Sequence, residues 1–121
     1  MLRISEYIRA SLEGKPARPF DGRILIWNLT NACNLNCSHC YAFANQLAPQ
    51  MLSIEQIKTV LPKLQEAKVR MVVLSGGEPL LRRDIFTIAE LCQEAGLHPT
   101  LSTNGLLINE KNVDRIKDHF S

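Results

Sequence analysis

The chain has 121 residues, of which 45% are apolar and 21% charged, a composition typical of one soluble globular domain. Its net charge is +2, and its 14 basic and 12 acidic residues are interspersed, which argues against a nucleic-acid-binding or membrane-surface module. No apolar run reaches the roughly 18–20 residues that span a bilayer, and the N-terminus lacks a signal-peptide pattern, so we expect a cytoplasmic protein.

The predicted elements begin with a short amphipathic helix. Apolar side chains recur at helical spacing from Ile4 to Leu12, which predicts an N-terminal helix within residues 1–13. Two glycines and two prolines follow closely, so residues 14–22 are interpreted as a linker. The apolar run from Ile24 to Trp27 then predicts a strand that is buried on both faces.

A second helix is predicted after the cysteine-rich segment. Ser53, with Gln56 three residues later, matches a capping box and marks the start of this helix. Its apolar stripe consists of Ile54, Ile57, Leu61 and Leu64. Pro62 lies inside the pattern and predicts that the helix is kinked or split.

Two further strand–helix pairs complete the predicted order. The run from Met71 to Leu74 predicts a strand, and Asp84 is a candidate N-cap for a helix that ends at Gly96. The residues that this helix turns towards the core are Ile85, Ile88, Ala89 and Cys92. The segment from Thr100 to Thr103 predicts a third strand, and Asn109 is a candidate cap for a last helix. The core-facing residues of the last helix are Val113, Ile116 and Phe120.

This alternation predicts an α/β fold in which residues 23–121 form three β-α units. Strands that alternate with helices favour a parallel sheet with right-handed crossovers. Three polar motifs each follow a predicted strand: Cys33–Tyr41, Gly76–Pro79 and Ser102–Gly105. Loops that follow consecutive parallel strands lie on one face of the sheet, so we expect the three motifs to converge on one site.

Three of the four cysteines, Cys33, Cys37 and Cys40, fall within eight positions. In a reducing compartment this clustering indicates metal ligation rather than disulfides. Structural zinc needs four ligands, and the only nearby candidate for the fourth is His39, which lies between two of the thiols. A [4Fe–4S] cluster suits three thiolates better, because each holds a separate iron and one iron stays open. A zinc-stabilised binding module without catalysis is the alternative.

The other polar residues have more than one interpretation. Gly76–Gly77 lets a ligand approach the backbone at a strand end, and Glu78 adds an acceptor for a cationic amino group. Glu78 also suits a helix N-terminus, and the two roles are compatible. Cys92 is interpreted as a buried apolar residue rather than a fourth cluster ligand. Arg82 and Arg83 are interpreted as the solvated start of a helix.

The motifs Cys33-x3-Cys37-x2-Cys40 and Gly76-Gly77-Glu78-Pro79, each after a strand, resemble those of the radical S-adenosylmethionine (SAM) superfamily. The resemblance extends from Ile24 to about Asn109. It implies the N-terminal half of a partial (β/α)6 barrel: three parallel β-α units preceded by a short helix, with the remaining units absent. The 121 residues are therefore expected to be inactive alone.

The resemblance also implies two cofactors. Cys33, Cys37 and Cys40 would bind a [4Fe–4S] cluster whose open iron chelates the amino and carboxylate groups of SAM. The residues implied to lie around SAM are His39 and Tyr41 near the adenine, Gly76, Gly77 and Glu78 at the methionyl amino group, and Ser102, Thr103 and Asn104 after the third strand. The reduced cluster would break a sulfonium bond, and the 5′-deoxyadenosyl radical would abstract a substrate hydrogen. An electron donor such as flavodoxin or ferredoxin is implied as a partner.

A finer resemblance concerns the substrate. Residues Met1–Tyr7 and Ile26–Leu29 are similar to NirJ-type proteins of heme d1 biosynthesis, in which propionate side chains are removed from a siroheme-derived tetrapyrrole. This resemblance implies a tetrapyrrole as the small-molecule substrate. Enzymes that modify peptides or decarboxylate heme precursors share the core motifs and are the alternatives.

Overall fold

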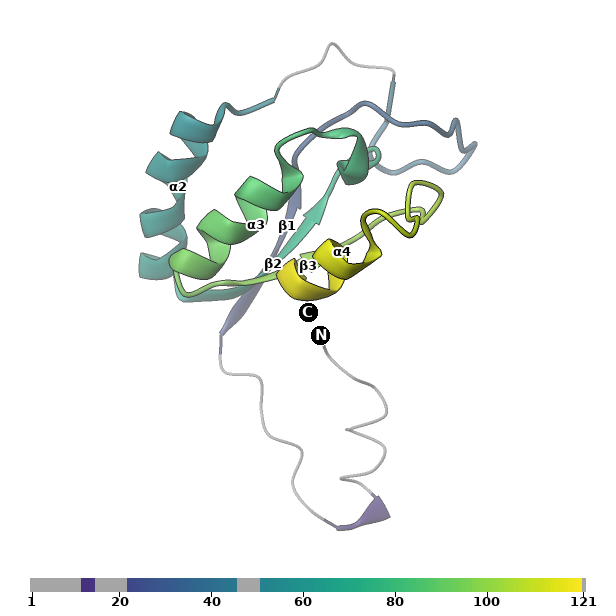
Figure 1. Ribbon diagram of the computed structural model, residues 1–121. Coiled ribbons are helices and arrows are strands. Elements are labelled where there is room, and N and C mark those ends of the chain that lie inside the picture. The colour runs from purple at the N-terminus through teal and green to yellow at the C-terminus, as the bar shows by residue number, and fades with distance from the viewer. Residues whose placement is uncertain (1–11, 15–21, 46–50, 121) are drawn as a thin grey trace.

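A computed structural model describes residues 12–14, 22–45 and 51–120, which are built around a three-stranded parallel sheet (Figure 1). The strands are β1 (Arg23–Asn28), β2 (Val69–Ser75) and β3 (His98–Leu101), and they lie in this order across the sheet. The helices are α2 (Ile54–Glu66), α3 (Ile85–Glu94) and α4 (Val113–His119), with a short 3-10 helix, η1 (Pro79–Leu81), after β2. The predicted three β-α units are confirmed. The predicted N-terminal helix and linker lie almost wholly outside the described residues.

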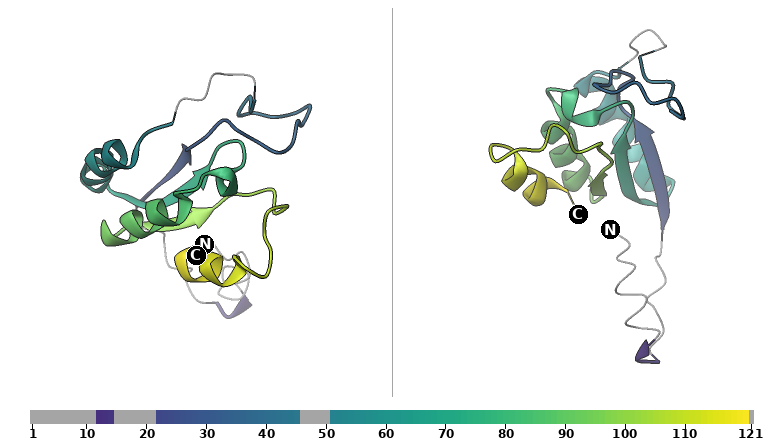
Figure 2. Two further views of the ribbon diagram at one scale, coloured as in Figure 1. Left: turned by 45° about the horizontal axis from the view of Figure 1, so that its top comes forward. Right: turned by 90° about the vertical axis from the view of Figure 1, so that its right-hand side faces the viewer.

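The helices cover one face of the sheet (Figure 2). Leu25 and Trp27 of β1 pack on this side, against the buried core formed by β2, α2 and α3. Ile24 and Ile26 alternate with them and point to the opposite face, where they are 45% and 63% exposed, so the predicted burial of this strand on both faces is wrong. Within the described residues, no helix is long and apolar enough to cross a lipid bilayer.

Helix α2 begins as the sequence predicts but is not interrupted. The Ser53 hydroxyl accepts from the Gln56 N–H at 3.2 Å, and the Gln56 side chain accepts from the Ser53 N–H at 2.9 Å. The sequence predicts a kink or a split at Pro62, and the split does not occur, because the helix continues to Glu66. Pro62 and Lys58, whose carbonyl loses its helical donor, are both exposed, so water can satisfy that carbonyl.

The third strand is displaced from its predicted position. The prediction was Thr100 to Thr103, whereas β3 begins and ends two residues earlier. Pairing with β2 sets these limits, since the first residue of β3 lies opposite Met71 and the last lies opposite Leu74. Thr103 consequently belongs to the loop after β3, where its hydroxyl is available for contacts with other loops.

Two predicted helix caps are not formed. Asn109 precedes a turn, in which its side chain accepts from the Lys111 N–H at 2.9 Å, and Asn112 occupies the N-cap position of α4. Asp84 occupies the N-cap position of α3 but makes no capping hydrogen bond. Its carboxylate is bonded to Arg82 instead, so an interaction outside the helix has replaced the cap.

The predicted inner face of α3 is confirmed. Ile85, Ile88, Ala89 and Cys92 are each at most 2% exposed, and Gly96 follows the helix with a φ of +67°. Burial raises the pKa of the Cys92 thiol to about 11. Cys92 is therefore a protonated core side chain at neutral pH, as predicted.

Cys92 is expected to resist alkylation in the folded protein. Its side chain is fully buried and the attacking thiolate is scarce at neutral pH, whereas the other three cysteines are at least partly exposed. Native treatment of the metal-free protein with iodoacetamide, followed by mass spectrometry, should locate the label on Cys33, Cys37 and Cys40. Labelling of Cys92 as fast as the others, without denaturant, would contradict this prediction.

Candidate functional site

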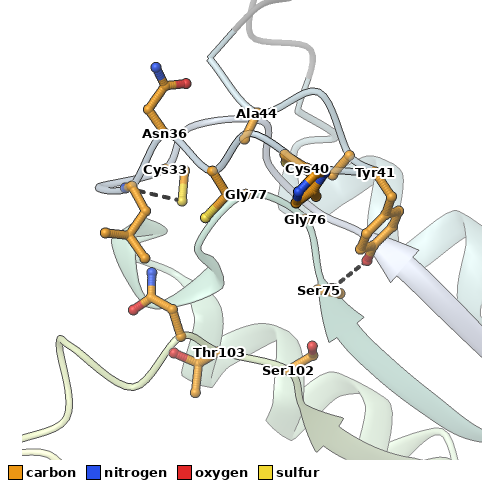
Figure 3. A pocket seen from close by; sticks show the side chains of 15 residues that line it. Cys33, Asn36, Cys40, Tyr41, Ala44, Ser75, Gly76, Gly77, Ser102 and Thr103 are labelled. Atoms are coloured by element: carbon orange, nitrogen blue, oxygen red, sulfur yellow. Dashed lines mark hydrogen bonds between the residues drawn. The ribbon is translucent and has the colours of Figure 1, made fainter.

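A cavity of about 300 Å³ lies where the carboxyl ends of the strands meet the cysteine loop, defined here as residues 29–45 (Figure 3). Its volume is at the lower end of the range of small-molecule sites. Its wall contains every site residue predicted from the sequence except Glu78: Cys33, Cys37, His39, Cys40, Tyr41, Gly76, Gly77, Ser102, Thr103 and Asn104. The wall residues that the sequence did not indicate are Leu35, Asn36, Ala42, Ala44 and Ser75. The three loops therefore converge as expected.

The cysteine loop is fastened to the turn that follows β2. The Gly77 N–H donates to the Thr30 carbonyl at 2.7 Å, which extends the contact between β1 and β2 beyond the strands. The Glu78 N–H donates to the Ala32 carbonyl at 2.8 Å. A Cβ atom on Gly76 would overlap the Thr30 backbone, and one on Gly77 would overlap that of Ala32. The glycines line the cavity, but their missing side chains make room for the cysteine loop itself.

Asn45, which the sequence analysis missed, closes the cysteine loop around Cys33. Its side-chain oxygen accepts from the Cys33 N–H at 2.9 Å. Its Nδ2 donates to the carbonyls of Cys33 and Leu35, at 3.0 and 3.3 Å. Its own N–H donates to the Asn31 carbonyl at 2.7 Å, and its φ of +63° is a conformation that asparagine tolerates. No local sequence pattern marks this contact, because its partner lies twelve positions away.

Glu78 lies behind the cavity wall and is fully buried. One carboxylate oxygen accepts from the Leu80 N–H at 2.9 Å and from the Thr103 hydroxyl at 2.8 Å. The other oxygen accepts from the Asn104 N–H at 2.9 Å. Glu78 therefore has the predicted role at a helix N-terminus, that of η1, and it also fixes the loop after β3.

Two side-chain contacts join the cysteine loop to the other loops. The hydroxyl groups of Tyr41 and Ser75 are 3.3 Å apart, as Figure 3 shows. The Asn104 Nδ2 donates to the Asn34 side-chain oxygen at 2.8 Å. Since Asn104 is also held by Glu78, all three loops belong to one hydrogen-bonded unit. Such a unit presents the wall residues in a fixed arrangement.

The candidate metal ligands at the cavity are three thiols. All four cysteines are free, and three of them line the wall. Within residues 12–14, 22–45 and 51–120, no three His, Cys, Asp or Glu side chains converge closely enough to hold one ion. A structural zinc ion takes four protein ligands, whereas three thiolates can each hold a separate iron of a [4Fe–4S] cluster. The donor set therefore fits a [4Fe–4S] cluster better than a zinc ion.

The interpretation of Arg82 and Arg83 as a solvated helix start is wrong for Arg82, which is buried. Its side chain is 5% exposed, whereas the neighbouring Arg83 is exposed. The guanidinium donates from Nη1 to the Leu29 carbonyl at 2.9 Å and from Nη2 to the Leu52 carbonyl at 2.6 Å. It also contacts both carboxylate oxygens of Asp84, at 2.7 and 3.0 Å. These hydrogen bonds hold the pKa of Asp84 below its ordinary value, against the opposing effect of partial burial.

The Arg82–Asp84 pair is expected to make folding acid-sensitive. The pKa of Asp84 is lower in the folded state, so the pair's stabilisation is complete above the unfolded-state pKa of about 3.9 and is lost as the pH falls through the folded value. Urea unfolding between neutral pH and about pH 3 should therefore show a shallower acid decline for Asp84→Asn than for the wild type. Identical declines would contradict this assignment.

The chain matches known proteins in both sequence and fold. A family model described as the radical SAM superfamily matches residues 27–120. The chain is 36% identical to the pre-heme d1 synthase of Dinoroseobacter shibae, over 98% of this chain and 30% of that protein. It is 35% identical to the Fe-coproporphyrin III synthase of Methanosarcina barkeri, over 78% of this chain and 24% of that protein. The chain thus spans less than a third of the length of these curated relatives.

The fold also matches a solved structure, that of BtrN in complex with AdoMet and 2-DOIA. The TM-score is 0.68 at 19% sequence identity, and the match covers 80% of this chain and 42% of that chain. At this level of identity the likeness concerns the fold. It agrees with the parallel β-α units of this chain.

Proposed function

The chain belongs to the radical SAM superfamily, and from that premise we propose that its cysteine loop binds a [4Fe–4S] cluster used to cleave SAM. Its three parallel β-α units form part of a (β/α) barrel. When bound, a reduced cluster of this kind supplies the electron that separates methionine from a 5′-deoxyadenosyl radical. The observation that carries the proposal is the convergence of three free cysteines with the loops after β2 and β3 around one cavity.

Cys33, Cys37 and Cys40 are the proposed ligands. A thiol binds iron as the thiolate. The Leu35 N–H donates to the Cys33 sulfur at 3.4 Å. Asn45 fixes the backbone on both sides of Cys33, so the sulfur and its donor keep their relative positions.

The other wall residues that the sequence predicts for the site are the proposed SAM contacts. SAM carries an amino group, a carboxylate, ribose hydroxyls and an adenine, which together need convergent donors, acceptors and a flat neighbour. The residues that offer these groups are His39, Tyr41, Gly76, Gly77, Ser102, Thr103 and Asn104. Glu78, which the resemblance implies at the methionyl amino group, supports this set by holding Thr103 and Asn104 from behind.

We further propose that the substrate is a tetrapyrrole and that residues 23–121 are the first three of six barrel units. Similarity to a pre-heme d1 synthase and to an Fe-coproporphyrin III synthase supports a heme-related substrate. The later units of the barrel would complete the site, and a flavodoxin or ferredoxin would supply electrons. The reaction itself would be removal of propionate side chains.

Anaerobic reconstitution of the full-length protein tests this function. We expect about four irons and four sulfides per chain, and release of 5′-deoxyadenosine when SAM and a reductant are added. With decarboxylated siroheme present, the mass of the tetrapyrrole should decrease. A protein that holds zinc and no iron would overturn the proposed cluster. Release of deoxyadenosine without a change in tetrapyrrole mass would overturn the proposed substrate.

Asn45→Ala is expected to weaken iron retention, because it removes three hydrogen bonds around the cysteine loop and places alanine at a positive φ. The loop should lose about 1–3 kcal/mol of stability. Asn45→Gly relieves the backbone strain and isolates the contribution of the amide. Iron content after gel filtration measures the effect, and an alanine variant with wild-type iron would contradict it.

A further inference from the structure

We propose that Arg82 is a positioning residue that holds both ends of the iron-binding segment, defined here as residues 29–52, and thereby controls how firmly the cluster is retained. This inference rests on the proposed function, because it concerns the same segment. Arg82 does not line the cavity and would touch neither cofactor. Its action would pass through the backbone that carries the cysteines.

The geometry places one guanidinium at the base of the segment. Leu29 is the first residue after β1, and Leu52 is the residue before the Ser53 cap of α2. All three cysteines lie between these two positions. Arg82 donates one hydrogen bond to each of the two carbonyls, at 2.9 and 2.6 Å, and so fixes where the segment leaves and rejoins the fold.

Asp84 fixes the orientation of this guanidinium. The two carboxylate oxygens accept from Nε and Nη2 of Arg82, at 2.7 and 3.0 Å, in a two-point contact. The remaining nitrogen, Nη1, is thereby aimed at Leu29. A lysine has a single ammonium group and cannot reproduce this planar fork. The arrangement therefore requires arginine at this position.

Arg82 also joins the cysteine loop to the second motif. Its backbone N–H donates to the Pro79 carbonyl at 3.0 Å and ends η1, which begins directly after Glu78. The turn that contacts the cysteine loop at Thr30 and the side chain that bonds to Leu29 and Leu52 thus lie close together in the sequence. A segment whose two ends are already fixed loses less conformational entropy when its thiolates bind iron.

Cluster loss from the full-length reconstituted protein tests the proposal. Iron release to a chelator is followed through the visible absorbance of the cluster, at a temperature well below unfolding. Arg82→Gln should release iron about tenfold faster than the wild type, since two charge-assisted hydrogen bonds are lost. Arg82→Lys should be intermediate, and it carries the test if the glutamine variant does not fold.

Two controls separate positioning from other effects. Arg83→Gln makes the same charge change at the exposed neighbour and should release iron at the wild-type rate. Ile88→Val removes one methyl group from the buried face of α3 and none of the hydrogen bonds that Arg82 makes, so it reports the effect of a lowered Tm.

The outcomes are distinguishable. Iron release from Arg82→Gln at the wild-type rate would overturn the positioning role, and so would equally fast release from Ile88→Val at a comparable loss of Tm. If the wild-type protein and Arg83→Gln also fail to hold iron, the proposed function itself is overturned, and this inference with it.

Discussion

Alanine substitution of Cys33, Cys37 or Cys40 is expected to abolish cluster binding and SAM cleavage. Each thiolate is proposed to hold a separate iron, so loss of one leaves two irons without protein ligands. Iron content should fall from about four to below about one per chain after gel filtration. Deoxyadenosine release should fall to background, because the electron for SAM cleavage comes from the cluster.

Cys92→Ala is the matched control for this prediction. Cys92 is fully buried on α3, with a pKa raised to about 11 by burial, and it is the only cysteine outside the cavity wall. Its replacement should reduce the free energy of unfolding by about 1 kcal/mol and leave the iron content unchanged. A cavity cysteine whose alanine variant keeps wild-type iron and activity would contradict the ligand assignment.

Gly77→Ala is expected to displace the cysteine loop and remove iron binding. Its Cβ would overlap the Ala32 backbone, which precedes the first proposed ligand directly and accepts the Glu78 N–H. The variant should lose about 1–3 kcal/mol of folding stability through overpacking. Gly76→Ala should lose about 1–3 kcal/mol more than Gly77→Ala does, because the φ of +135° at Gly76 is strained for alanine.

Gly96→Ala controls for backbone strain alone. Gly96 follows α3 with a φ of +67°, and the nearest atom to an added Cβ is Nε2 of Gln65 on α2, 3.8 Å away. This variant should lower Tm but retain full iron. Urea unfolding and iron content measured on the same samples separate the two effects. A Gly77→Ala protein with wild-type values for both would show that the loop tolerates the methyl group.

The sequence predicted the fold and the convergence of the site for a general reason. In a parallel sheet, the loops after successive strands meet at one edge, so motif order alone brought the cysteines, Gly76, Gly77 and Asn104 together. The inner face of α3 followed from its helical period. The limits of β3 did not follow, because they depend on pairing with β2.

Residues with distant partners were beyond prediction. Arg82 and Arg83 are adjacent and chemically identical, yet only Arg82 meets carbonyls at Leu29 and Leu52, which are 53 and 30 positions away. The same holds for Asn45, whose partner Cys33 is reached only once the loop has closed. Glu78 shows a related limit. Its motif marked it as important, but its inward direction emerged from contacts with the loop after β3.

The electron paramagnetic resonance spectrum of the reduced, reconstituted full-length protein, recorded before and after addition of SAM, tests the central claim most directly. Three cysteine ligands leave one iron of the cluster open. We therefore predict an iron–sulfur signal whose shape changes when SAM binds to that iron. The Cys33→Ala protein should show no such signal. A signal that SAM leaves unchanged, or no iron–sulfur signal in the wild type, would contradict the account.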